Sequence, residues 1–68
     1  MSYEVFQQRV NILVNRMKGV KPKVNFRHDA ERGKHYANFS DGTTIIGNTV
    51  AKKVMVRWGS GHQSIATI

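Results

Sequence analysis

The chain has no cysteine, a single proline and only four acidic residues, against eleven Lys and Arg, in a length of 68 residues. Without cysteine it forms neither disulfides nor thiolate metal sites, so packing within the chain or against a second chain must stabilise the fold. No apolar run approaches the roughly 20 residues that span a bilayer, and the segment MSYEVFQQRV lacks the basic-then-apolar order of a signal peptide. We therefore expect a cytoplasmic protein with no membrane partner.

The short length predicts one domain, residues 1–68, with one small core. A chain of this size buries only about 60% of the surface that its unfolded form exposes, so we expect modest stability. Dimerisation is one remedy that small chains use.

The basic residues far outnumber the acidic ones, which gives a net charge of +7 and a sequence pI near 10.4. Seven of the basic residues fall between positions 16 and 34, and Lys52, Lys53 and Arg57 form a second group. Clustered cations favour an anionic partner, since each neutralised phosphate releases counterions. The simpler interpretation is that the charge only keeps a small protein soluble.

Residues 2–18 have the spacing of an amphipathic helix. The apolar positions on its predicted inner face are Phe6, Val10, Leu13 and Met17. Ser2 can cap the start, Gly19 can end the helix, and Pro22 prevents it from resuming. Because a helix of this length is marginal alone in water, we expect its apolar face to pack on a sheet.

Beyond Pro22 the apolar residues alternate with polar ones, which is typical of strands. The expected strands are residues 23–28, 34–40, 43–47, 54–58 and 63–68. Asp41 and Gly42 favour a type I′ turn between the second and third strands. One helix followed by short strands predicts an α+β fold, in which an N-terminal helix packs on a small antiparallel sheet of four to five strands.

The outward positions of these strands combine cations, amides and an aromatic ring. Such side chains contact phosphates, hydrogen-bond base edges and stack on bases. The candidate nucleic-acid-binding residues are Lys21, Lys23, Arg27, Arg32, Lys34, Tyr36, Asn38 and Arg57. An ordinary solvated sheet face has a similar composition, so it is the net charge that favours the functional interpretation.

No catalytic, metal-binding or cofactor-binding motif is present in the sequence. The loop GSGH before the last strand could present backbone amides to an anion beside Arg57 and His62, or could simply join two strands next to a core Trp58. Neither phosphate-binding glycine fingerprint is found. The spacing of His28, His35 and His62 matches no standard zinc pattern. We therefore expect a non-enzymatic protein without metal or cofactor.

The segment RGKHYANFSDGTTI, residues 32–45, resembles the histidine-containing hairpin of the HicA-type toxins. These are small basic ribonucleases that act on messenger RNA and have a double-stranded-RNA-binding-like fold. The resemblance implies that His35 would be the catalytic histidine, with Lys34 in place of the usual serine. The family closes with a helix, whereas this chain ends in the strand-like segment VMVRWGSGHQSIATI.

The size, the charge and the segments FSDGT and WGSGH are also similar to those of small basic proteins encoded by bacteriophages and prophages. This resemblance implies regulation of host or phage genes, or inhibition of a host defence, in the cytoplasm of a bacterial host.

The sequence thus leads first to a module whose sheet binds RNA or DNA. The second hypothesis is an inhibitor or regulator whose basic face docks on an acidic host protein, because complementary charge also steers protein association. The third is a HicA-like ribonuclease that uses His35. In addition, the uncharged C-terminal segment SIATI predicts an edge strand that could pair with its counterpart in a homodimer.

Overall fold

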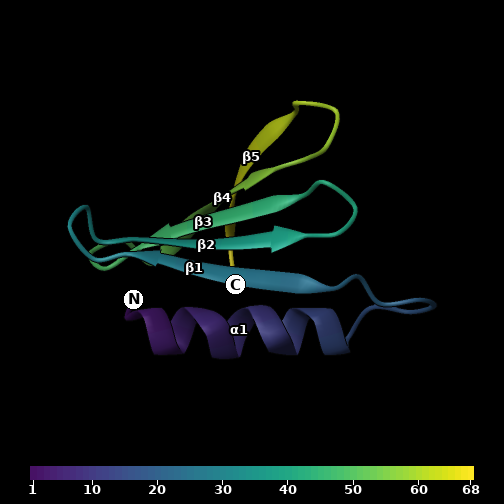
Figure 1. Cartoon of the computed structure of the whole chain (residues 1–68), viewed down its shortest axis with the longest axis horizontal. Coiled ribbons are helices and arrows are strands. Elements are labelled where there is room, and N and C mark those ends of the chain that lie inside the picture. The colour runs from purple at the N-terminus through teal and green to yellow at the C-terminus, as the bar shows by residue number, and fades with distance from the viewer.

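The computed structural model describes residues 1–68 and contains one helix and five strands (Figure 1). In chain order these are α1 (Tyr3–Asn15), β1 (Val24–Asp29), β2 (Lys34–Phe39), β3 (Thr44–Asn48), β4 (Lys53–Arg57) and β5 (Gln63–Thr67). Each strand pairs antiparallel with the next, in the order β1-β2-β3-β4-β5. The predicted α+β fold with an N-terminal helix on an antiparallel sheet is confirmed. The helix α1 is too short and too polar to span a membrane.

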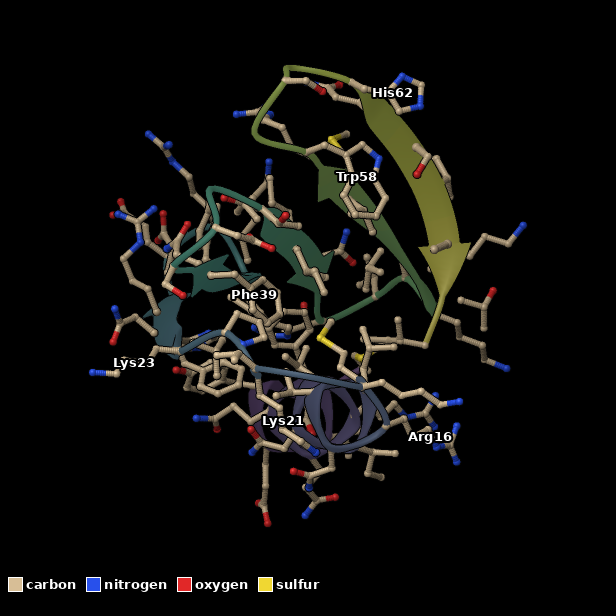
Figure 2. The ribbon with its side chains drawn as sticks, turned by 90° about the vertical axis from the view of Figure 1, so that its right-hand side faces the viewer. Arg16, Lys21, Lys23, Phe39, Trp58 and His62 are labelled. Atoms are coloured by element: carbon tan, nitrogen blue, oxygen red, sulfur yellow. The ribbon has the colours of Figure 1, made fainter.

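The sheet arches over α1, as the view along the helix in Figure 2 shows, with β1 at one border and β5 at the other. The helix contributes Phe6 and Val10 to the core, both fully buried. The strands contribute the buried side chains of Ala37, Phe39, Ile45, Val54 and Val56. These strand residues all come from alternate positions that face the helix, so the other face of the sheet has no covering element.

Helix α1 begins where the sequence predicts, because the Ser2 side chain accepts a hydrogen bond from the backbone N–H of Val5 at 3.2 Å. It ends at Asn15, earlier than the predicted Lys18. The N–H of Arg16 bonds to the carbonyl of Leu13 at 3.2 Å as well as to that of Ile12, which tightens the last turn.

The carboxyl end of α1 is capped by a residue from the following loop. Lys21 donates from Nζ to the carbonyl oxygen of Asn15 at 2.7 Å. A helix over residues 2–18 would have Arg16 and Lys18 in its last turn, but the last turn of α1 contains no basic residue. Because the chain reverses at Gly19, with φ of 81°, Lys21 reaches back to the negative end of the helix instead.

The turn between β2 and β3 is not the predicted type I′ turn. Gly42 has a φ of 90°, but no residue other than glycine has a positive φ, so Asp41 does not adopt the required conformation. The N–H of Phe39 donates to the carbonyl of Thr43 at 2.8 Å, and the N–H of Gly42 donates to the carbonyl of Phe39 at 3.1 Å. This pattern is a three-residue loop with a left-handed glycine, the alternative hairpin connection.

Asp41 stabilises this turn as a carboxylate. Its Oδ1 accepts a hydrogen bond from the backbone N–H of Thr43 at 2.9 Å. That bond, joined by one from the Thr43 side chain, lowers the pKa of Asp41 below its ordinary value of 3.8. The carboxylate is therefore favoured in the folded state more than in the unfolded state.

We expect the stability difference between the native chain and an Asp41→Asn variant to depend on pH. Because the folded pKa lies below the unfolded pKa, the carboxylate stabilises the fold above the unfolded pKa, and this advantage disappears as the pH falls through the folded value. Urea unfolding of both chains near neutral pH and again near pH 2 measures the difference. A difference that stayed constant would contradict the role of Asp41.

Candidate nucleic-acid interface

The candidate interface is the open face of the sheet, which we define as the side-chain positions that point away from α1. On β2 the alternation is clear, since His35, Ala37 and Phe39 are buried while Lys34 and Asn38 are exposed. The strand pairing extends the same alternation from β1 to β5. Helix-facing and outward-facing residues are thereby separated by the pleat of the sheet alone.

The registers place one residue from each strand in a row across the whole open face. This central row is Arg27, Tyr36, Ile46, Met55 and Ile65. It runs from a cation through an aromatic ring to three aliphatic side chains. Its last member, Ile65, is 64% exposed. A row of this kind offers both stacking and apolar contact to a flat partner.

A second, parallel row is polar and lies directly beside the central row. This polar row is Asn25, Asn38, Thr44, Arg57 and Gln63. Within it, the Thr44 hydroxyl donates to the Asn38 side-chain oxygen at 3.0 Å. Because that bond occupies the oxygen, the amide group of Asn38 keeps its N–H donors available for an acceptor above the sheet.

Arg27 and Tyr36 contact each other at the β1 end of the central row. The guanidinium carbon of Arg27 lies 4.4 Å from the centre of the Tyr36 ring. This cation–π contact holds a long side chain flat against the sheet. A base that stacks here can therefore use the guanidinium plane as well as the tyrosine ring.

Cations lie within and beside both rows, whereas carboxylates are scarce on this face. The cations that point outward are Lys23, Arg27, Lys34, Lys53 and Arg57. Lys23 joins the group because the pairing of β1 and β2 continues one residue further, with the N–H of Ser40 bonded to the Lys23 carbonyl at 2.9 Å. Figure 2 shows its side chain pointing away from the helix. The only outward carboxylate on a strand is Asp29.

Two of the sequence-predicted residues lie off the open face. Lys21 lies at the carboxyl end of α1, where it caps the helix (Figure 2). Arg32 lies in the loop between β1 and β2, where its Nε is 3.9 Å from Oδ2 of Asp29. An exposed pair of this kind contributes little to stability. The remaining predicted residues, namely Lys23, Arg27, Lys34, Tyr36, Asn38 and Arg57, share the open face.

His35 lies on the other face of the sheet, between β2 and α1, and is 0% exposed. Its Nε2 is 2.9 Å from the carbonyl oxygen of Met1, and its Nδ1 is 3.1 Å from Nδ1 of His28. Since the carbonyl can only accept, Nε2 donates the hydrogen of that bond, while Nδ1 is held against the ring of His28. Both nitrogens are therefore occupied, and nothing in this arrangement favours a general base acting on a substrate.

Trp58 was expected in the core but is 44% exposed. It follows the last residue of β4 and, with Leu13, Met17 and Phe39, lines an apolar groove of about 210 Å³ near the carboxyl end of α1. The adjoining loop closes on itself, because the N–H of Gly61 bonds to the carbonyl of Trp58 at 2.9 Å. This loop thus connects β4 and β5 in the same way that Asp41 and Gly42 connect β2 and β3.

The sequence prediction missed Lys53 and the apolar half of the central row. Met55 and Ile65 were assigned to strands, but nothing local in the sequence says that they lie opposite each other and in line with Tyr36. Alternation within β4, where Val54 and Val56 are buried, is enough to place Met55 on the outward face. Only the strand registers show which residues of the neighbouring strands lie beside it.

Comparison of the chain with protein-family models, with curated proteins and with solved structures gave no match.

Proposed function

We propose that this chain binds single-stranded nucleic acid across the open face of its sheet. The observation that carries the proposal is that the central row and the outward-pointing cations share the one uncovered face of the sheet. Phosphates would contact Lys23, Lys34, Lys53 and Arg57, and bases would stack on Arg27 and Tyr36.

A single strand fits this face better than a duplex does. Duplex readers insert a helix or a two-stranded ribbon into a groove. Here the helix is packed under the sheet through Phe6 and Val10, and the strands form one continuous surface. Splayed bases can lie flat on such a surface, while the polar row offers the Asn38 side chain to their edges.

Salt dependence of oligonucleotide binding tests the electrostatic part of the proposal. The affinity for labelled single-stranded RNA and DNA of mixed sequence should fall steeply as salt rises, with a logarithmic slope of about −0.7 per neutralised phosphate. A double variant, Lys34→Gln with Arg57→Gln, should reduce the size of the slope by about 1.4. Fluorescence anisotropy over a series of salt concentrations measures both.

A matched control uses Arg16→Gln with Lys18→Gln. This variant loses the same charges and residue types, but its substitutions lie at the end of α1 rather than on the open face (Figure 2, Arg16). It should retain nearly the native slope. Equal reductions of the slope in the two variants would show that binding depends on total charge alone and not on the open face. If neither oligonucleotide binds at low salt, the proposal is contradicted and an acidic protein partner is favoured.

Tyr36 tests the stacking part with the charge held constant. Tyr36→Ala should weaken single-strand binding by about 1–3 kcal/mol, whereas Tyr36→Phe should bind nearly as well as the native chain because it keeps the ring. Circular dichroism confirms that both variants are folded. Equal affinities of the alanine and phenylalanine variants would remove stacking from the proposal.

A further inference from the structure

Strand β5 forms a free border of the sheet, with no other element beside it in Figure 2. Its residues, Gln63 to Thr67, include no charge and no proline. The other border differs, because β1 carries Arg27 and Asp29. Charged side chains at an edge discourage pairing with another strand, and an uncharged edge invites it.

The phase of the backbone hydrogen bonds decides which groups of β5 face outward. The N–H of Trp58 donates to the carbonyl of His62 at 2.8 Å, so these two residues form a hydrogen-bonded pair of the antiparallel ladder. Bonded and non-bonded pairs alternate along such a ladder. With Val56 opposite Ser64 and Val54 opposite Ala66, these two residues of β5 bond to β4.

The N–H and C=O groups of Gln63, Ile65 and Thr67 therefore point away from β4 at the free border. No backbone partner for them exists within the chain, because β5 is the last strand of the sheet. The outward backbone groups are spaced symmetrically about Ile65, so this edge can pair with an antiparallel copy of itself. Of the antiparallel registers that join outward groups, the one centred on Ile65 pairs every residue of the strand.

We propose that two copies of this chain associate through β5 into one continuous antiparallel sheet, with a two-fold axis at Ile65. Ile65 of each copy exchanges both backbone bonds with Ile65 of the other, and Gln63 does the same with Thr67. On the face that packs against α1, Ser64 of one copy lies opposite Ala66 of the other. These are closely spaced non-bonded pairs, and the two small side chains fit there.

Each copy carries a net charge of +7, but the cations of β4 stay apart across the proposed junction. Lys53 lies opposite Thr67 within one chain, and Arg57 lies opposite Gln63. In the joined sheet, Lys53 of one copy is thus three strand spacings, about 14 Å, from Arg57 of the other. That separation exceeds the screening length of about 8 Å at physiological salt.

The association also joins the two central rows end to end at Ile65, which would give one binding face across both copies. This consequence rests on the proposed function, whereas the β5 pairing does not. For that reason the dimer is tested without nucleic acid, so that failure of one proposal is distinguishable from failure of the other.

Analytical ultracentrifugation over a range of concentrations is expected to give twice the chain mass of 7.7 kDa at high concentration. Ile65→Lys places two ammonium groups opposite each other at the axis and should give a monomer. Ile65→Thr, which keeps an uncharged β-branched side chain, should keep the dimer. A monomeric native chain, or a dimeric Ile65→Lys variant, would overturn the proposal.

Cross-linking tests the interface itself, since the chain has no cysteine of its own. Ile65→Cys should be linked efficiently by a short bis-maleimide, because directly opposite side chains lie about 4.5–5.5 Å apart at Cβ. Asn25→Cys on β1 is the matched control, since the two copies of that strand would lie about 40 Å apart. Efficient linking through position 25 rather than 65 would place the contact elsewhere and overturn the β5 pairing.

Discussion

Phe6→Ala is expected to remove most of the free energy of unfolding of this chain. Phe6 is 0% exposed, and its ring contacts Phe26 edge-on at 6.3 Å and His35 at 5.5 Å between ring centres. Truncating a buried phenylalanine to alanine costs about 3–5 kcal/mol. Small domains have total stabilities near the lower end of about 5–15 kcal/mol, so this loss removes most of the stability.

Urea unfolding followed by circular dichroism and by the fluorescence of Trp58 measures the effect. The control is Ile12→Ala on the same helix, where the side chain is half exposed and is not part of the buried core cluster. It should change the free energy of unfolding by well under the Phe6 effect, since exposed sites usually stay within about 0.5 kcal/mol. Equal losses at the two positions would contradict the position of the core.

Gly47→Ala is the second substitution with a large expected effect, although it adds only one methyl group. A Cβ at position 47 would lie 2.9 Å from Cδ1 and 3.0 Å from Cε1 of the Phe6 ring, and 3.4 Å from Cγ1 of Val54. The ring is enclosed and cannot move freely, so overpacking of this kind should cost about 1–3 kcal/mol.

The double variant Gly47→Ala with Phe6→Leu separates steric overlap from other effects. If the methyl group is costly because it meets the ring, then it should cost less once the ring has been replaced by a smaller side chain. The measured quantity is the coupling between the two positions in a double-mutant cycle. Strictly additive costs would show that the close approach of Gly47 to Phe6 is not the cause.

The elements of this fold were predictable because their signals are local. The spacing of Phe6 and Val10 indicates a helix with one apolar face, and the alternation of His35, Ala37 and Phe39 indicates a strand with one buried face. Both patterns depend on residues a few positions apart. The class and order of the elements followed from them, and the structure has both.

The errors arose where contacts that a pattern of apolar and polar residues does not show decide the local conformation. The helix was predicted to continue to Lys18, but the chain reverses at Gly19 and Lys21 caps the earlier end at Asn15. The Asp41-Gly42 pair suits a type I′ turn, yet the strands leave three residues for the loop, so only Gly42 takes a positive φ. Trp58 was expected in the core, but it lines a groove beside Leu13 and Met17 and is 44% exposed.

The candidate interface was predictable only in part, for the same reason. Alternation alone separated Arg27, Tyr36 and Asn38 from the core-facing positions. It could not show that Ile46, Met55 and Ile65 continue the line that Arg27 and Tyr36 begin, because a register is a relation between strands. Likewise, the burial of His35 depends on Met1 and His28, which lie far from it along the chain or on another strand.

By itself, the sequence determined the excess of positive charge, the amphipathic helix and the alternating strands, since each of these is a property of composition or of near neighbours. The tertiary structure decided which face of the sheet the helix covers, which outward residues stand in one row, and which backbone groups of β5 remain unpaired. The strand registers and the face that α1 covers are both set by contacts between residues that are distant in the chain, which local sequence patterns do not contain.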